Sequence, residues 1–372
     1  MTLTIILIAA FCLAYANGAN DNFKGVATLF GSGTTSYRKA LVWSTLTTFL
    51  GSLVAVLMAE KLLNSFSGRG LVDDGLTTDA QYLAAVGLGA GCTVLLATWV
   101  GMPVSTTHGL VGALIGAGWA AGSVINLRSL GGQFFLPLLV SPVVAIALTG
   151  LCYPFLHLAR VRWGITEQSC FCVGQETVEV VPVLSHLAAL QRVEQLTASL
   201  GTEVSCQKRY DGRLLGVSAA TALDWLHYLS AGTVSFARGL NDTPKIAALL
   251  LVVPLVGSFG SVGLVGLVVA CGGLVSARRV AETMSRKITP MNHGQGFTAN
   301  LLTGLIVIGA SRLGMPVSTT HVSCGALFGI GTVTRQARWG MIGKILTAWL
   351  TTLPLGAALG ALGYWAVTFL IP

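Results

Sequence analysis

The chain has 372 residues, of which 53% are hydrophobic and only 10% are charged, and glycine accounts for 46 of them. Soluble globular domains carry about 25% charged residues, so this composition excludes an ordinary soluble protein and indicates a polytopic membrane protein. The formal net charge is +8, but the basic residues are scattered without interleaved aromatic residues or a recognisable binding module, so we expect no nucleic-acid partner.

Six apolar runs are of a length that crosses a lipid bilayer. Apolar and polar residues do not alternate within them, so they predict helices and not the strands of a barrel. We therefore predict an all-α polytopic membrane protein. The runs lie near residues 3–16, 40–58, 83–100, 133–156, 250–275 and 345–371.

The first apolar segment contains polar and charged residues that a lipid-facing helix would avoid. Asn17, Asn20, Asp21 and Lys24 all lie within it. Such groups are costly in lipid, so we expect them to line a polar site enclosed by the protein, with the helix interrupted there. The segment lacks a basic start, so we interpret it as a retained span and not as a cleaved signal peptide.

Two patterns occur twice in the chain. Asn-Asp-x-x-Lys at residues 20–24 returns at 241–245, an offset of 221 (241 minus 20). Gly-Met-Pro-Val-Ser-Thr-Thr-His at residues 101–108 returns letter for letter at 314–321, an offset of 213 (314 minus 101). We therefore predict two copies of one unit, joined by a polar segment that forms a cytoplasmic loop or a small helical insertion. The first copy covers residues 1–157, the polar segment 158–216 and the second copy 217–372.

The basic residues predict how the two copies are oriented, because cytoplasmic loops collect Lys and Arg. With the N-terminus outside, fifteen of the 22 basic residues fall inside, three fall outside, and four belong to the repeated motifs. Equivalent loops then carry opposite charge bias in the two copies, which is typical of inverted-topology repeats. We expect the protein in the cell (inner) membrane, with both termini outside and the central segment in the cytoplasm.

The duplicated octapeptide has the features of a helix start, with Pro in the first turn and Ser or Thr as the cap. The apolar runs around it are short for a full crossing, so we expect broken or re-entrant helices whose N-termini meet at depth. Two such helix ends, both rich in hydroxyl groups, would bind a small anion. The predicted anion-binding residues are Ser105, Thr106, Thr107, Ser318, Thr319 and Thr320.

A histidine ends each octapeptide. We expect His108 and His321 to orient the neighbouring hydroxyl groups or to carry a proton. A structural role for the Ser-Thr-Thr triplets, in helix capping and close helix packing, stays open. Arg238 and Arg312 border the polar motifs, and each either contacts the anion, snorkels to the membrane surface or pairs with a carboxylate.

The Asn-Asp patterns supply oxygen atoms that favour a cation beside the anion. Asn20, Asp21, Asn241 and Asp242 are therefore expected to hold Na⁺ or, at the carboxylates, a titrating proton. Binding opposite charges together lowers the cost of each, which is the physical basis of symport. We expect no metal or cofactor other than Na⁺ as a coupling ion.

Duplication of every candidate residue favours transport, in which each half of the molecule forms a gate. An intramembrane hydrolase would need a unique nucleophile, so we do not expect an enzyme. The chain has no Gly-x-x-x-x-Gly-Lys-[Ser/Thr] motif, so it is not expected to be an ATP-driven pump by itself. The alternative from a different class is an anion sensor that does not transport, with the central segment as its output.

These motifs resemble the inorganic phosphate transporter (PiT) family of cation-coupled phosphate symporters. The family's Gly-Ala-Asn-Asp signature is intact at residues 18–21 and degenerate at 239–242, its Pro-Val-Ser-Thr-Thr-His element occurs twice, and residues 278–289 look like its glutamate-bearing linker. The resemblance covers both repeats. It implies an inverted-repeat fold of about 10 to 12 membrane segments, a homodimer, and transport by alternating access. It further implies that the Ser/Thr motifs hold phosphate and the Asn-Asp motifs hold Na⁺.

The chain departs from this family three residues after each Asp. The family has a second Asn there, whereas this chain has Lys24 and Lys245. Three residues on a helix place the Asp and the Lys on one face, so each ammonium group replaces a bound Na⁺, contacts the anion, or only holds the helix together. Loss of a sodium site would leave proton-coupled or uncoupled anion movement. Sulfate and bicarbonate stay open as substrates.

Eight cysteines are spread thinly along the chain. Cys170, Cys172 and Cys206 share the central segment with His186. These residue types bind metals, but their spacing fits no standard zinc pattern, so the sequence predicts no metal site there.

Overall fold

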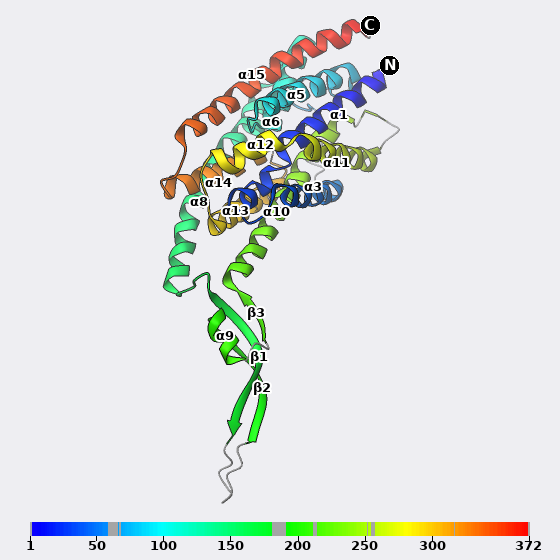
Figure 1. Ribbon diagram of the computed structural model, residues 1–372. Helices are drawn as coiled ribbons and strands as arrows, with labels where there is room; N and C mark the ends of the chain where they lie inside the picture. Colours follow the sequence, from blue (N-terminus) through cyan, green and yellow to red (C-terminus); the bar gives the residue numbers. More distant parts are fainter. Residues whose placement is uncertain are drawn as a thin grey trace, which may run out of the picture. The chain divides into compact units, whose positions relative to one another are not determined.

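The computed structural model describes residues 2–58, 66, 68–180, 191–210, 214–250, 252–253, 257–315 and 317–370. The chain forms two compact units, and each is considered by itself. The larger unit consists of Met1–Tyr153 and His227–Pro372, and the smaller unit of Pro154–Leu226. Figure 1 traces the chain.

The larger unit is helical over its described residues, and its helices α8 and α10 continue into the smaller unit. Short 3-10 or π segments follow or precede several helices: η1 (Lys24–Val26), η2 (Leu76–Thr78), η3 (Leu130–Phe135), η4 (Ala248–Leu250) and η5 (Thr283–Lys287). The α-helices are α1 (Thr2–Asp21), α2 (Ala27–Gly31), α3 (Tyr37–Met58), α5 (Ala80–Val100), α6 (Thr106–Ala120), α7 (Leu127–Ser129), α8 (Leu136–Arg162), α10 (Ala219–Ala247), α11 (Gly257–Ser276), α12 (Arg278–Glu282), α13 (His293–Arg312), α14 (Thr319–Val333) and α15 (Trp339–Leu370).

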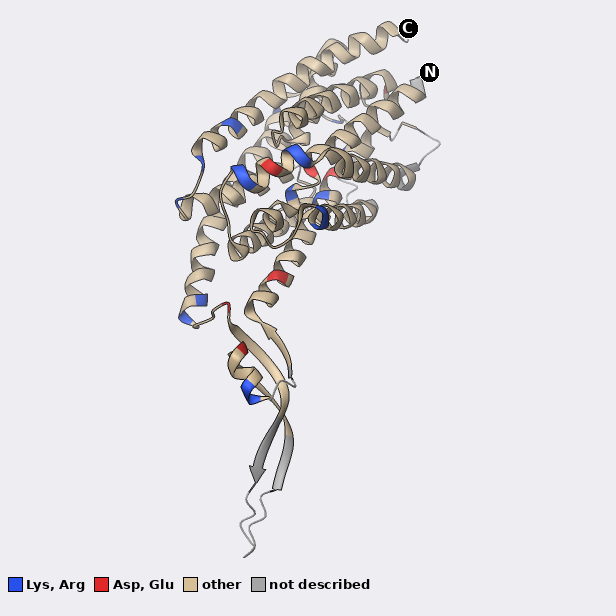
Figure 2. Cartoon of the chain, viewed as in Figure 1, with Lys and Arg blue, Asp and Glu red and all other residues tan. Residues whose placement is uncertain are grey.

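Four segments of the described chain are long and apolar enough to cross a membrane, and a fifth is a pair of helices bent by 67°. Figure 2 shows how few charged residues lie along these helices. The expected polytopic, mostly helical membrane fold is therefore confirmed. The number of membrane segments, about 10 to 12, and the inverted orientation of the two repeats stay a prediction. The four segments are Thr4–Gly31, Ala80–Val100, Leu127–Arg162 and Trp339–Leu370, and the bent pair is Gly260–Ser276 with Arg278–Lys287.

Helices of the two sequence repeats interleave. Helix α15, from the second repeat, packs along α5 and α6 of the first, as Figure 1 shows. Helix α11, also from the second repeat, packs along α1 and α3 of the first. The buried hydrophobic clusters of the larger unit combine residues of both repeats, so the polar motifs of both are carried on helices of one shared bundle.

Glycine permits the closest of these contacts. A Cβ atom built at Gly116 of α6 would lie 1.8 Å from the carbonyl oxygen of Ala357 in α15. One built at Gly18 of α1 would lie 2.0 Å from the carbonyl oxygen of Val269 in α11. Lipid offers no hydrophobic driving force between helices, so close backbone packing at small residues supplies the attraction. This accounts for part of the unusually high glycine content.

The smaller unit contains a three-stranded antiparallel sheet over its described residues, in the order β2-β1-β3. Helix α9 packs on all three strands. This differs from the loop or small helical insertion expected from the polarity of the segment. The exposed face of the sheet carries apolar side chains such as Phe171, Leu200 and Leu215, whereas the face under α9 carries cysteines and hydroxyl residues. The strands therefore lack the usual alternation of apolar residues inside and polar residues outside. The elements are β1 (Ser169–Val180), β2 (Gln191–Thr202), α9 (Glu203–Arg209) and β3 (Leu214–Ser218).

Replacing Gly116 by leucine should force α6 away from α15. Overpacking of this kind costs about 1–3 kcal/mol, so we expect a clear fall in the midpoint of thermal unfolding in detergent. Gly309→Leu in α13 is the matched control, because no atom of the described residues outside its own stretch of helix lies within 4 Å of a Cβ built at Gly309. Equal midpoints for the two variants would contradict the packing of α6 on α15.

Candidate functional site

The two Asn-Asp-x-x-Lys motifs lie at the ends of helices α1 and α10. Helix α1 ends at Asp21 and η1 begins at Lys24, so the first helix is interrupted as expected. Helix α10 instead continues through Asp242 to Ala247, with Pro244 inside its last turn. The two motifs therefore share their sequence pattern but not their helix ending.

Both octapeptides form the capped helix starts that the sequence predicts. Gly101 follows α5 with a φ of 76°, a left-handed conformation that glycine adopts without strain. Ser105 then caps α6, its Oγ accepting a hydrogen bond of 3.1 Å from the backbone N–H of His108. Ser318 caps α14 in the same way, with a distance of 3.2 Å to the backbone nitrogen of His321.

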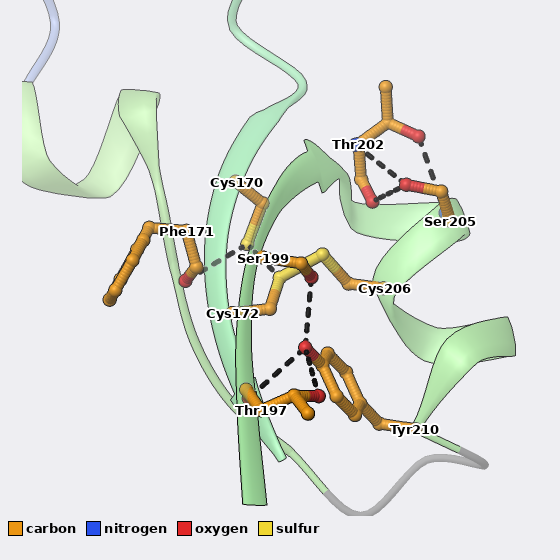
Figure 3. Close-up of a disulfide and its surroundings, with 9 residues drawn as sticks. All are labelled: Cys170, Phe171, Cys172, Thr197, Ser199, Thr202, Ser205, Cys206 and Tyr210. Carbon is orange, nitrogen blue, oxygen red and sulfur yellow. Dashed lines mark hydrogen bonds between the residues drawn. A yellow bond between two sulfur atoms is a disulfide. The ribbon is translucent and has the colours of Figure 1, made fainter. Parts of the chain in front are cut away.

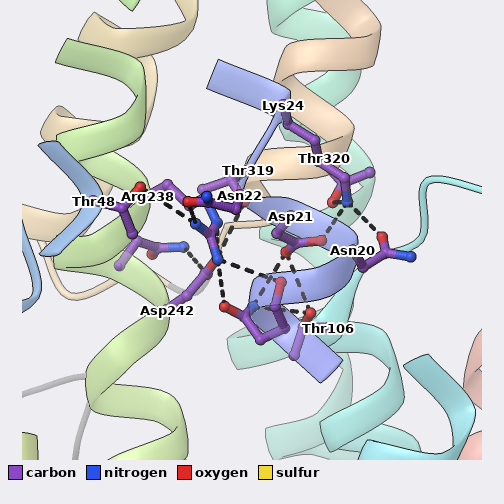
Figure 4. Close-up of polar contacts among 12 residues, drawn as sticks. Asn20, Asp21, Asn22, Lys24, Thr48, Thr106, Arg238, Asp242, Thr319 and Thr320 are labelled. Carbon is purple, nitrogen blue, oxygen red and sulfur yellow. Dashed lines mark hydrogen bonds and ion pairs between the residues drawn. The ribbon is translucent and has the colours of Figure 1, made fainter. Parts of the chain in front are cut away.

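Each aspartate lies beside the first residue of one of these helices. The Thr106 hydroxyl donates to Oδ2 of Asp21, and the Thr319 hydroxyl donates to Oδ2 of Asp242, both at 3.3 Å. Figure 4 shows both contacts. A carboxylate is stabilised near the positive end of a helix dipole, so the two motifs of each repeat build one site.

The ammonium group of Lys24 is enclosed by oxygen atoms from both repeats (Figure 4). It donates to Oδ1 of Asn20 and to the carbonyl oxygen of Val104, both at 2.9 Å, and to the Thr320 hydroxyl at 2.5 Å. It also forms an ion pair with Asp21. The side chains of Lys24 and Asp21 are only 1% and 2% exposed, so water contributes little to this arrangement.

Lys245 makes the corresponding contacts in the second repeat. Its Nζ donates to the carbonyl oxygen of Val317 at 2.9 Å and lies 3.3 Å from Oδ1 of Asp242. Its third contact is a hydrogen bond of 3.0 Å to the Thr107 hydroxyl of the first repeat.

The lysine contacts are reciprocal between the repeats. Each ammonium group uses the Asp and a backbone carbonyl of its own repeat and a threonine of the other repeat. The two threonines, Thr107 and Thr320, are equivalent positions because they differ by the octapeptide offset of 213 (320 minus 107). The structure thus brings the predicted anion-binding and cation-binding motifs into direct contact.

The two asparagines tie each motif to its octapeptide. Asn20 Nδ2 donates to the Thr98 hydroxyl at 2.9 Å and to the carbonyl oxygen of Met102 at 3.0 Å. Asn241 accepts a hydrogen bond of 3.4 Å from the hydroxyl of Ser311. Thr98 and Ser311 were not predicted as site residues, although hydroxyl side chains at the octapeptide offset (311 minus 98) were a usable signal.

Arg238 is a further buried residue of the site, and the structure places it against a carboxylate. Its guanidinium donates from Nη2 to Oδ1 of Asn17 at 2.6 Å and from Nη1 to Oδ1 of Asn22 at 3.2 Å, and its Nε lies 3.8 Å from Oδ2 of Asp242. Arg238 is 1% exposed, whereas Arg312 is exposed at the end of α13. The offset of 221 aligns Arg238 with Asn17 (238 minus 17), which identifies it as part of the duplicated motif.

The charges of this site do not cancel. Among the described residues, five buried side chains are formally charged, and all five lie here: three cations and two carboxylates. The formal sum is +1 (three minus two). Buried charges are tolerated only when paired and hydrogen-bonded, so the excess positive charge favours binding of an anion. The five residues are Asp21, Lys24, Arg238, Asp242 and Lys245.

The two octapeptide histidines face each other. The ring centroids of His108 and His321 lie 4.6 Å apart, and the His321 ring lies 3.9 Å from that of Trp349, tilted by 38°. His321 Nδ1 is 3.3 Å from the carbonyl oxygen of Leu138. His108 Nδ1 and His321 Nε2 are buried without a hydrogen-bond partner among the described protein atoms. The contact of each histidine with its triplet runs through its backbone N–H, and the roles of the rings stay a prediction.

Comparison with known proteins places the chain among transporters. Residues 17–360 match the sequence profile of the Phosphate transporter family. A Rhizobium meliloti protein whose name refers to low-affinity inorganic phosphate transport is 29% identical over 97% of this chain and 95% of its own length. A Pyrococcus furiosus protein, whose name refers to a phosphate permease, is 25% identical over 99% of this chain and 97% of its own length.

The fold is similar to a solved structure described as the sodium-dependent phosphate transporter. The TM-score is 0.77 at 22% sequence identity, and the match covers 100% of both chains. The members of this family are transporters, which confirms the prediction that the protein is not an enzyme. Together with the apolar helices and the paired motifs, the match over nearly the whole length shows that this chain is an integral membrane protein that belongs to the phosphate transporter family.

Proposed function

We propose that this chain moves inorganic phosphate across the membrane by alternating access, with Lys24 and Lys245 at the positions where the family would hold a coupling cation. One observation carries this proposal. Each ammonium group is bound by a carboxylate, a backbone carbonyl and a hydroxyl, the oxygen types that a hard cation such as Na⁺ prefers.

The anion site is assigned to the space between the starts of α6 and α14. Helix N-termini and hydroxyl groups bind phosphate without further charge, and the formal excess of one positive charge nearby adds attraction. Ser105 and Ser318 use their oxygen atoms as acceptors in capping, so their hydroxyl hydrogens are free to donate to an anion. The names of the relatives favour phosphate over sulfate or bicarbonate.

Burial supports alternating access. The side chains of the two Asp-Lys pairs are between 1% and 6% exposed, so an anion enters only after part of the bundle moves. Lys24 with Thr320 and Lys245 with Thr107 are among the contacts that cross between the repeats. In the proposed mechanism, opening toward one side of the membrane requires contacts of this kind to break.

Sodium fits this site poorly. A cation at either Asp would have to displace an ammonium group that is covalently tethered and already paired. We therefore propose that transport does not require Na⁺ and is coupled to protons or follows the phosphate gradient alone.

Uptake of radiolabelled phosphate into proteoliposomes tests the role of the lysines. We expect the same initial rate when external Na⁺ is replaced by choline at constant pH, because an ammonium group already pairs with each of the two aspartates expected to hold Na⁺. The double variant Lys24→Asn/Lys245→Asn restores the family pattern and should acquire stimulation by Na⁺. Strict Na⁺ dependence of the unaltered protein would overturn this proposal, and phosphate binding without any flux would instead support a sensor.

Removing the serine hydroxyls tests the anion site. Glycine replaces serine at a helix N-cap at a cost of only a few tenths of a kcal/mol, so Ser105→Gly and Ser318→Gly should fold normally. Loss of a hydrogen bond to a charged group costs about 1.5–3 kcal/mol, so phosphate binding should weaken by about tenfold or more in each. The control is Thr202→Gly, which alters the N-cap of α9 in the smaller unit. Unchanged phosphate affinity in both serine variants would show that the site lies elsewhere.

A further inference from the structure

Three cysteine sulfur atoms meet in the smaller unit. Cys170 and Cys172 are two residues apart on β1, so they share one face of the sheet. Helix α9 brings Cys206 onto the same face, where it forms a disulfide with Cys172 (Figure 3). Cys170 remains a thiol, with its Sγ 3.1 Å from that of Cys172. All three sulfur atoms lie within 4.8 Å of one another.

The sulfur cluster is also the buried core of the described part of this unit. The three cysteines and Tyr210 form its hydrophobic cluster, and none of the four is more than 5% exposed. The Tyr210 hydroxyl donates to Ser199 Oγ at 2.9 Å, which fixes the ring beside the sulfur atoms. Units with so small an apolar core are commonly stabilised by disulfides or by a bound metal.

Whether a disulfide or a metal ion stabilises this unit depends on the redox state of the compartment in which it lies. Disulfides persist in oxidising compartments, whereas cytoplasmic thiols are kept reduced. The distribution of basic residues predicts the central segment in the cytoplasm. In the cytoplasm the disulfide would be reduced, which would leave three thiols close to one another.

We propose that Cys170, Cys172 and Cys206 are a thiolate site for one soft metal ion of the Zn²⁺ class, which the Cys172–Cys206 disulfide closes on oxidation. The unit would then have two stabilised states, one held by a metal ion and one held by a disulfide.

The geometry fits a tetrahedral thiolate site. Zinc–sulfur bonds of about 2.3 Å place two sulfur ligands about 3.8 Å apart, and the sulfur atoms of Cys170 and Cys172 are 3.1 Å apart. After reduction, Cys172 and Cys206 are no longer bonded and can separate to the ligand spacing. A cavity of about 550 Å³ lined by Cys170, Cys206 and Glu203 gives the ion access. A water molecule or the Glu203 carboxylate supplies the fourth ligand.

Reduction of the Cys172–Cys206 disulfide precedes binding of the metal ion. A dithiol or phosphine reductant supplies two electrons, and with two protons the Cys172–Cys206 bond becomes two thiols. Together with Cys170, three thiols then release three protons as the ion binds. In the oxidised state only Cys170 is left as a sulfur ligand, so the site loses its ion. His186, which lies near these cysteines in the sequence, is outside the described residues.

Titration of the full-length protein in detergent tests the site. After reduction by a water-soluble phosphine and removal of the reductant, Cd²⁺ is added and its thiolate charge-transfer absorption is followed, with Zn²⁺ measured by competition against a chromogenic chelator. We expect one ion per chain at this site, and none after mild oxidation. Cys170→Ser and Cys206→Ser should each weaken binding by at least about tenfold. Cys92→Ser, in an exposed position on α5, is the control and should bind as the unaltered protein does.

Alkylation gives a readout that does not depend on a variant that folds. In the reduced protein, Zn²⁺ should protect Cys170, Cys172 and Cys206 from an iodoacetamide reagent, as located by mass spectrometry, and should leave Cys92 unchanged. Equal metal binding by the reduced and oxidised proteins, or by Cys170→Ser and the unaltered chain, would overturn the proposal. So would a disulfide that the phosphine cannot reduce in the folded protein. Neither readout depends on phosphate transport, so the proposed function stands or falls separately.

Discussion

The exchange of hydrogen bonds between the repeats is the interaction on which the site depends. Lys24 of the first repeat binds Thr320 of the second, and Lys245 of the second binds Thr107 of the first. Each ammonium group therefore completes its coordination only when the two repeats are assembled. Thr107 lies on α6, which packs along α15, and Lys24 follows α1, which packs along α11, so this interleaving of the repeats positions both residues. Glycine makes that interleaving close enough for side chains of this length to meet.

Burial explains why these charges occur as a cluster. An isolated ion in the middle of a membrane protein is costly, and even a paired one recovers its desolvation cost only with good geometry and further hydrogen bonds. Each Asp here has both, since it accepts from a lysine of its own repeat and from the first threonine of a helix. Arg238 breaks the symmetry, because its counterpart in the first repeat is the neutral Asn17. The resulting excess of positive charge is a property of the second repeat.

Much of this site could be predicted from the sequence, because its parts are local and occur twice. The Ser105 and Ser318 caps follow from residue types within one helical turn, and the Asp-Lys pairs follow from a spacing of three. The partners of the lysines could not be predicted, since Lys24 and Thr320 are 296 residues apart and meet only through helix packing. The sheet of the smaller unit was missed for a different reason. The face of the sheet under α9 carries cysteines on β1 and hydroxyl residues on β2, so the alternation of its strands carries little hydrophobic signal.

A tethered cation changes the energetics of a carrier in a way that a bound ion does not. A symported Na⁺ binds on one side and dissociates on the other, so its gradient performs work on the anion in every cycle. A lysine neutralises the same carboxylate equally well, but it returns with the protein and transfers no charge between compartments. In the proposed mechanism the lysines therefore keep the electrostatic function of the coupling ion and lose its driving function. The driving force must then come from the phosphate gradient or from a proton gradient. A proton that is bound to phosphate crosses the membrane with it and needs no separate binding site in the protein.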